Sequence, residues 1–165
     1  MRLTDFTDYT LRALMYLAIR DDRLATIEEI AETYEISKHH MSKIIQRLSA
    51  VGWIETVRGR HGGIRLAQHT RSLTVGAVVR ETEHDFVLAS CQASDGREPC
   101  SIVQHCRLKD ILYAAKEAFL ADLDRCTLAE LATPAEPFAQ EFDVFWFGVV
   151  APLNHGTDLK QETGQ

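Results

Sequence analysis

Residues 37–66 read SKHHMSKIIQRLSAVGWIETVRGRHGGIRL, and this stretch predicts a helix followed by a β-hairpin. In its first half, apolar side chains recur at helical spacing: Met41, Ile44, Ile45 and Leu48. Ser37 is a residue type that caps helix N-termini, and Gly52 ends the apolar pattern. In the second half, apolar and polar residues alternate on both sides of a glycine-rich turn at residues 58–63, which predicts a β-hairpin.

A shorter helix is predicted immediately before this stretch. Thr26 and Glu29 have the spacing of a capping box, and the helix that they open extends to about Tyr34. Only a brief turn separates this helix from the one that follows Ser37, so the pair predicts a helix-turn-helix. A hairpin with a basic tip directly after a helix-turn-helix is typical of a winged helix.

Four more helices are predicted outside this motif. Residues 5–20 and 107–124 show apolar side chains at the helical repeat, and residues 73–83 follow with Thr74 as a cap. Thr127 opens a short fourth helix with a second capping box. The expected fold class is therefore mostly α with a small β-hairpin wing (α+β). It combines a winged helix-turn-helix domain with a long dimerisation helix.

The predicted domain organisation has four parts. Residues 1–83 form a winged helix-turn-helix DNA-binding domain, and residues 84–106 form a loop that carries three cysteines. Residues 107–133 hold the long helix and the short helix after it. Residues 134–165 form a C-terminal extension that is rich in aromatic side chains and is expected to be partly disordered.

Charge is spread unevenly along the chain. The 165 residues carry a formal charge of −6. Residues 37–71 hold seven Lys or Arg against one acid, Glu55, and so carry +6, which leaves −12 for the remainder. A basic patch on an acidic molecule favours double-stranded DNA as the partner. The residues predicted to bind DNA lie at the start of the second helix and on the hairpin: Ser37, Lys38, His39, His40, Lys43, Arg58, Arg60, His61 and Arg65.

Each part of this patch has a chemical reason to bind DNA. The first turns of a recognition helix meet base edges in the major groove, where Lys38 and His39 reach guanine or phosphate. Ser37 stands at the helix N-terminus, a position that binds phosphate. The arginines of the wing are suited to the phosphate backbone or to a narrow minor groove.

Composition excludes several other classes of protein. The chain is 45% hydrophobic and 25% charged, which is typical of a globular protein and excludes wholesale disorder. No apolar run approaches the roughly 18 residues that a membrane span needs, and the opening is not a signal peptide, so we expect a cytoplasmic protein with no membrane partner. No nucleotide fingerprint and no nucleophile–base pair is found, which argues against an enzyme.

The cysteines point to metal or redox chemistry. Cys91, Cys100 and Cys106 lie within sixteen residues, with spacing C-x8-C-x5-C. This spacing matches neither tandem CxxC zinc ribbons nor the ferredoxin run. Three thiolates on one loop can converge on a metal, and the residues alone leave zinc, an iron–sulfur cluster and a redox thiol switch open. Cys126 is interpreted as a structural thiol, and His105 is not expected to be a ligand.

Four segments together resemble one known family: MRLTDFTDYTLRALMYLA at the start, the wing VRGRHGGIRLA, the segment EPCSIVQHCRLK, and CTLAEL. They are similar to the NsrR/IscR/RirA family of iron–sulfur winged-helix transcription regulators, over about the first 132 residues. The resemblance implies a homodimer that binds promoter DNA and is held by the helix from Arg107. It also implies an iron–sulfur cluster on the three cysteines, which makes residues 84–106 a cluster-binding loop.

Within this family, the residues FTDY (6–9) and CRLK (106–109) most resemble the branch of nitric-oxide-sensing repressors with a [4Fe–4S] cluster. A [2Fe–2S] cluster is the alternative cofactor. The resemblance implies that the fourth ligand is the partner subunit's Asp8, with Arg12 one helical turn on and near enough to bond that carboxylate. Taken from the residues alone, Asp8 would be an ordinary first-turn acid favoured by the helix dipole.

Two other functions stay open at this point. The eight residues between Cys91 and Cys100 form a lengthened gap, as in the iron-responsive RirA branch, so the alternative signal is iron supply. A redox carrier or a zinc-stabilised module that does not bind DNA is a third interpretation. The IscR branch is disfavoured, because its histidine after the last cysteine is replaced here by residues 107–110, RLKD.

Overall fold

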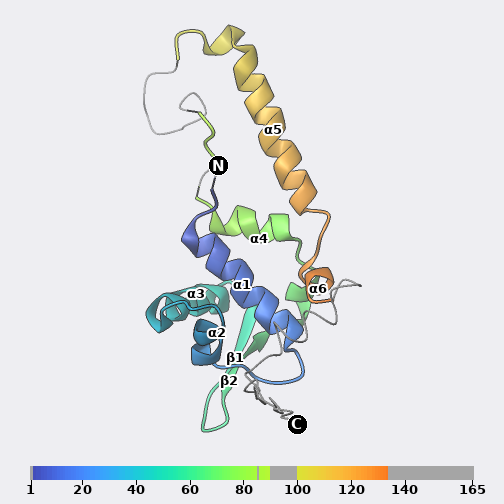
Figure 1. Ribbon diagram of the computed structural model, residues 1–165. Coiled ribbons are helices and arrows are strands. Elements are labelled where there is room, and N and C mark those ends of the chain that lie inside the picture. The colour runs from blue at the N-terminus through green and yellow to red at the C-terminus, as the bar shows by residue number, and fades with distance from the viewer. Residues whose placement is uncertain (1, 85, 90–99, 134–165) are drawn as a thin grey trace, which may run out of the picture. The chain divides into compact units, whose positions relative to one another are not determined.

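The computed structural model describes residues 2–84, 86–89 and 100–133 (Figure 1). The chain divides into two units, 1–133 and 134–165, of which the second lies outside the described residues, as does Cys91. The described elements are α1 (Asp5–Ile19), α2 (Ile27–Thr33), α3 (Lys38–Ala50), β1 (Ile54–Val57), β2 (Gly63–Leu66), the 3-10 helix η1 (Gln68–Ser72), α4 (Val75–Thr82), the 3-10 helix η3 (Val103–His105), α5 (Arg107–Leu123) and α6 (Leu128–Leu131). The predicted fold class is confirmed.

Most helices begin at a hydroxyl side chain that caps the first turn. Each cap accepts a hydrogen bond from the backbone N–H three residues on: Thr4 of α1, Thr26 of α2, Ser37 of α3, Thr74 of α4 and Thr127 of α6. At Thr127 the capping box is complete, because the Glu130 carboxylate accepts from the Thr127 N–H at 2.7 Å. The predicted boundaries therefore follow from local chemistry.

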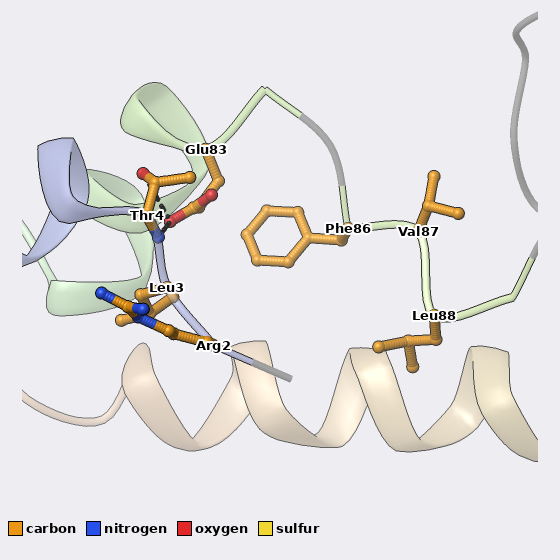
Figure 2. A pocket seen from close by; sticks show the side chains of 7 residues that line it. All are labelled: Arg2, Leu3, Thr4, Glu83, Phe86, Val87 and Leu88. Carbon is orange, nitrogen blue, oxygen red and sulfur yellow. Dashed lines mark hydrogen bonds between the residues drawn. The ribbon is translucent and has the colours of Figure 1, made fainter.

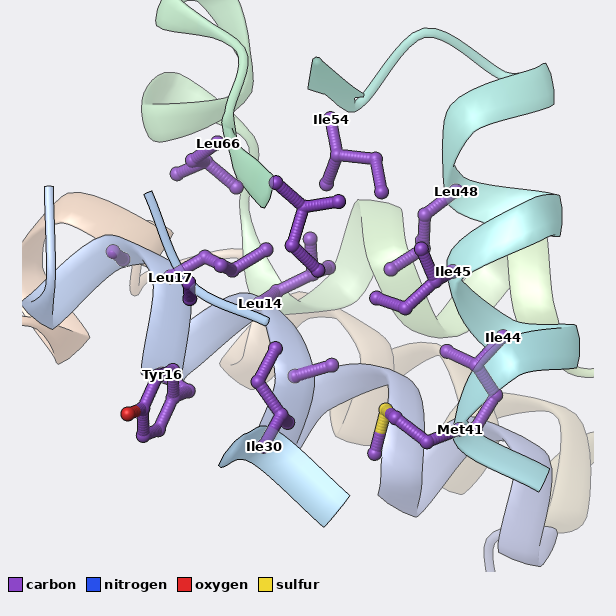
Figure 3. Packing of buried hydrophobic residues seen from close by; sticks show 14 of the residues in the cluster. Leu14, Tyr16, Leu17, Ile30, Met41, Ile44, Ile45, Leu48, Ile54 and Leu66 are labelled. Atoms are coloured by element: carbon purple, nitrogen blue, oxygen red, sulfur yellow. The ribbon is translucent and has the colours of Figure 1, made fainter. Parts of the chain in front are cut away.

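One hydrophobic core joins α1, α2, α3 and the hairpin (Figure 3). The apolar residues predicted for α3 are all buried: Met41, Ile44, Ile45 and Leu48. They pack with Leu14 and Leu17 of α1, both 0% exposed, and with Ile54 of β1. Truncating a side chain such as Leu14 to alanine would cost about 2–5 kcal/mol, because the cavity could not collapse.

The hairpin is bound to the linker between α1 and α2. Its strands pair antiparallel from Ile54↔Leu66 to Val57↔Gly63. The backbones of Ala25 and Ile64 exchange two hydrogen bonds, at 2.9 and 2.8 Å. A Cβ on Gly63 would lie 2.7 Å from the Ala25 carbonyl oxygen, so only glycine permits this approach. The wing is thereby held in place beside the helix-turn-helix.

Helix α5 is exposed for most of its length. Leu120 is its buried residue, whereas Leu108 and Ile111 are 59% and 63% exposed. The sequence did not predict η1, whose Thr70 is buried and donates a hydrogen bond to the Trp53 carbonyl oxygen at 2.9 Å. Among the described helices, none has the length and apolar character required to cross a bilayer.

Candidate functional site

The first turn of α3 presents polar side chains to solvent. Ser37 accepts a hydrogen bond from the His40 N–H at 3.3 Å, which fixes the start of the helix. Lys38, His39, His40 and, one turn later, Lys43 are all exposed, while the opposite face of α3 is buried in the core. Burial of one face therefore aims these four side chains away from the protein.

The turn between α2 and α3 contains a strained residue. Glu35 has a φ of +54°, in the left-handed region that residues other than glycine rarely adopt. The Ile36 N–H donates to the Ala31 carbonyl oxygen at 2.8 Å, and Ile36 is buried. Burial of Ile36 holds this turn, and the turn sets the angle at which α3 leaves α2.

The wing tip carries exposed basic side chains at its turn. Arg58, Arg60 and His61 are exposed, and Gly59 has a φ of +118°. A Cβ on Gly62 would lie 2.2 Å from the Val57 carbonyl oxygen, so the turn requires glycine there. The tip can therefore approach a nucleic-acid backbone closely.

The basic side chains of residues 37–71 fall into two classes. Four of them pair with a carboxylate: Lys38 with Glu28 at 2.9 Å, Arg47 with Glu81 at 2.7 Å, Arg65 with Glu55 at 2.7 Å and Arg71 with Asp21 at 2.5 Å. Lys43, Arg58 and Arg60 have no carboxylate partner within the described residues. Sequence reasoning missed Glu28, because only the packing of α2 on α3 brings it to Lys38.

Two of the three predicted cysteine ligands bracket one turn. Cys100 is exposed, Cys106 is half-buried, and both are free thiols. Cys106 directly follows η3, and Cys100 lies three residues before it, where its carbonyl oxygen accepts a hydrogen bond from the Val103 N–H at 2.9 Å. Cys106 is the N-cap of α5, and its side chain makes no capping hydrogen bond. The thiolate of a cysteine is the form that binds iron or zinc. The donor set in this turn therefore fits a thiolate-ligated group.

The remaining cysteines are placed differently. Cys91 lies outside the described residues, and those that are described hold no group of three or more His, Cys, Asp or Glu able to bind a metal ion. Cys126 is half-buried, and its Sγ lies 3.6 Å from the Thr127 carbonyl oxygen. Burial raises the pKa of the Cys126 thiol, which disfavours the reactive thiolate.

The predicted pair of Asp8 and Arg12 is present. The Arg12 Nε lies 3.0–3.1 Å from the carboxylate oxygens of Asp8, and the Asp8 side chain is 44% exposed. The Arg12 guanidinium also lies 5.8 Å from the ring centre of Tyr34, the residue that ends α2. One side chain thus connects Asp8 to the helix-turn-helix.

The N-terminus of α1 is fastened to the end of α4. The Thr4 N–H and hydroxyl donate to the Glu83 carboxylate at 2.7 and 3.1 Å. The buried Thr7 hydroxyl bonds that of Thr82 at 2.9 Å. Beside these bonds lies a cavity of about 330 Å³, into which the Phe86 ring turns (Figure 2). The helix that carries Asp8 is therefore held against the segment that leads to the cysteine loop.

Comparison with known proteins places these features in one family. Residues 3–134 match the Rrf2 family, described as an iron-dependent transcriptional regulator. The chain is 48% identical over 132 residues to the HTH-type transcriptional regulator NsrR of Geobacillus kaustophilus. The matched region covers 79% of this chain and 89% of that protein. It is 46% identical over 137 residues to the regulator of the same name from Bacillus subtilis. This match covers 82% of this chain and 93% of that protein.

A solved structure agrees with the fold. The crystal structure of oxidised CymR from Staphylococcus aureus superimposes with a TM-score of 0.65 at 22% identity, over 82% of this chain and 99% of that chain. The two curated relatives are transcriptional regulators and not enzymes. The resemblance inferred from the sequence motifs is therefore confirmed.

Proposed function

This chain belongs to the Rrf2 family of transcriptional regulators, and from that premise we propose that it is a homodimeric repressor that senses nitric oxide. In this proposal a [4Fe–4S] cluster is bound by Cys91, Cys100, Cys106 and the partner subunit's Asp8. The intact holo-protein binds palindromic promoter DNA, and nitric oxide abolishes that binding. The observation that carries the proposal is the pair of free thiols on either side of η3, Cys100 three residues before it and Cys106 directly after it.

The donor chemistry of this site supports an iron–sulfur group. Thiolates are soft ligands that select iron–sulfur clusters and zinc, and Cys106 lies at the N-terminal end of α5. The Asp8 carboxylate is a harder donor, held by Arg12 at 3.0 Å. When bound, the cluster supplies iron centres that combine with nitric oxide.

The chain provides a route from the cysteine loop to the DNA-binding helix. Cys106 begins α5, and α5 ends at Asp124, which is paired with Arg80 of α4 at 2.6 Å. Glu83 at the end of α4 accepts from Thr4 at the start of α1. Because α1 packs against α3 in the core, a shift of the loop would reach the recognition helix through these two polar contacts and the apolar contact of α1 with α3.

Exposure along α5 supports a dimer. Leu108 and Ile111 lie one turn apart on α5 and are more than half exposed, and adjacent large apolar side chains of this kind favour an interaction surface. A second copy of the chain would cover it. Two winged helices related by a two-fold axis would then meet half-sites about one helical turn, or a multiple of it, apart.

Binding of palindromic promoter DNA depends on the exposed side chains of α3 and the wing. The nine residues predicted to bind DNA are all exposed. The cations without a carboxylate partner in the described part, Lys43, Arg58 and Arg60, are the ones free to neutralise phosphates. Each phosphate contact adds about 0.9 to the slope of log affinity against log salt, so binding should weaken steeply with salt.

An iron-supply regulator is the second candidate function. The eight-residue gap between Cys91 and Cys100 favours it, because it gives the loop the lengthened spacing of the iron-responsive branch. In that case occupancy of the cluster is itself the signal.

The bound group can be identified directly. Protein purified without oxygen is assayed for iron, acid-labile sulfide, zinc and visible absorption. We expect a brown protein with iron and sulfide in equal amounts and little zinc. Replacing Cys100 or Cys106 by serine should remove the visible absorption, whereas Cys126→Ser should leave it unchanged. A colourless protein that contains zinc, or one with no metal, would contradict the proposal.

A further inference from the structure

Glu28 and Lys38 connect the first turns of the two helices of the helix-turn-helix. The Lys38 Nζ lies 2.9 Å from the Glu28 Oε1, and both side chains are 61% exposed. Glu28 is in the first turn of α2, and Lys38 is the first residue of α3. An acid therefore stands beside the lysine that is best placed to reach a base.

This pairing distinguishes Lys38 from the other exposed cations of the surface. Lys43, Arg58 and Arg60 have no carboxylate partner among the described residues. A lysine ammonium has three N–H donors, of which Glu28 takes one. The two donors that remain are enough for the O6 and N7 acceptors of a guanine.

We propose that Glu28 determines specificity for DNA sequence. It holds the Lys38 ammonium in position for contact with a base, and it prevents Lys38 from binding backbone phosphates of any sequence. The inference rests on the proposed binding of DNA by α3. A free lysine is a mobile point charge that binds any phosphate, whatever the sequence. With Glu28 beside it, the local charge is neutralised, and a backbone phosphate placed there is repelled by the carboxylate.

Neutral base edges are affected differently. Guanine offers dipolar acceptors and no net charge, so the Glu28 carboxylate repels a base edge far less than it repels a phosphate. Glu28 thus weakens binding to non-specific DNA more than binding to the operator. The protein gains discrimination between sequences and gives up total affinity.

The test compares Glu28→Gln with a matched control, Glu32→Gln. Glu32 is exposed on the same helix and forms none of the ion pairs of the described part, so both variants change the net charge equally. Affinity is measured for a duplex selected from a random library by the wild-type holo-protein, and for poly(dI-dC). Salt titrations are made with both DNAs.

For Glu28→Gln we expect tighter binding to poly(dI-dC), with a salt slope steeper by about 0.9, because Lys38 is freed to neutralise a phosphate. The ratio of specific to non-specific affinity should fall about two- to fivefold, the range of one exposed charge pair. Glu32→Gln should leave both the ratio and the salt slope within error. The thermal midpoints of the two variants should agree, which separates this effect from lost stability.

A double-mutant cycle shows whether Glu28 acts through Lys38. In a Lys38→Gln background, adding Glu28→Gln should change the specificity ratio much less than it does with Lys38 present, because only the direct repulsion of phosphate by the carboxylate is then removed. An unchanged ratio in Glu28→Gln, an equal fall in Glu32→Gln, or an effect of the same size without Lys38 would overturn the inference. If wild-type protein binds no duplex at all, the DNA-binding proposal itself is wrong, and the inference is overturned with it.

Discussion

Arg80 and Asp124 form a two-point ion pair that joins α4 to the end of α5, with Nη1–Oδ1 at 2.7 Å and Nη2–Oδ2 at 2.6 Å. The hydrogen bonds from Arg80 lower the pKa of Asp124, and the Thr74 hydroxyl donates to the same carboxylate at 3.1 Å. A Cβ on Gly76 would lie 2.1 Å from Asp124 Oδ1, so α4 makes room for this carboxylate. Through this ion pair, side chains connect the end of α5 to α4 of the winged-helix domain.

Asp124→Asn should weaken the contact between α4 and α5. The amide carries no charge and has one acceptor oxygen in place of two, so the two-point ion pair with Arg80 is lost. The thermal midpoint should therefore fall, and the amides of residues 74–77 should exchange faster with deuterium. Asp122→Asn is the matched control, because Asp122 pairs only locally with Arg125 at 3.2 Å within the described part, and both side chains are more than three-quarters exposed. Equal exchange in the two variants would show that α5 is held by its apolar contacts alone.

Glu29 should make the stability of the helix-turn-helix depend on pH. Hydrogen bonds from Arg23, opposed by burial and aided by Tyr16, lower the pKa of Glu29 from 4.5 to about 2. A lowered carboxyl pKa stabilises the fold fully above pH 4.5, and this stability is lost as the pH falls from 4.5 toward 2. Glu29→Gln should therefore cost about 1–3 kcal/mol at pH 7 and progressively less below pH 4.5. Urea unfolding across this range measures the difference, and a constant difference at all pH values would contradict it.

Ile111→Asp should separate the proposed dimer. Ile111 is 63% exposed in the single chain, so an acid there costs little folding stability but would be buried unpaired in an interface. Sedimentation should show monomers at concentrations where wild type is a dimer, and promoter binding should be lost with it. Tyr113→Asp is the control, since Tyr113 is 57% exposed and lies two residues on, on the other side of α5. A dimeric Ile111→Asp would place the interface elsewhere.

Asp8→Ala should change the bound cluster without preventing its assembly. Three thiolates remain to hold it, so we expect an altered visible spectrum and an altered rate of reaction with nitric oxide. Asp8→Cys should give a more slowly reacting, all-thiolate site. Asp5→Ala is the matched control, because Asp5 is also a first-turn acid of α1 and pairs with Arg2 at 2.5 Å. If Asp8→Ala and Asp5→Ala both match wild type, Asp8 is an ordinary acid at the helix N-terminus.

The helices and the hairpin could be predicted because their signals are local. A hydroxyl at the N-cap of every described α-helix except α5, together with apolar residues at helical spacing, places the helix boundaries within a residue or two, as at Ser37 and Thr127. The 3-10 helix η1 was missed because five residues show no repeat. For α3, the predicted buried face and the predicted exposed face are both confirmed.

The contacts that organise the site could not be predicted in the same way. Glu28 and Lys38 are ten residues apart, Arg80 and Asp124 are 44 apart, and Thr4 and Glu83 are 79 apart. Such pairs depend on how whole helices pack, which no local pattern encodes. The Asp8–Arg12 pair could be foreseen, because residues four apart share one face of a helix.

In the proposed function, nitric oxide acts on the cluster and thereby releases DNA. This is tested by titrating the anaerobic holo-protein with nitric oxide and measuring visible absorption and promoter binding on each sample. A parallel titration uses an iron chelator. We predict that nitric oxide abolishes DNA binding in step with the loss of cluster absorption, at a few molecules per cluster and before any iron leaves the protein. Promoter binding that survives complete reaction with nitric oxide, and is lost only when the chelator removes iron, would contradict the account and favour an iron-supply regulator.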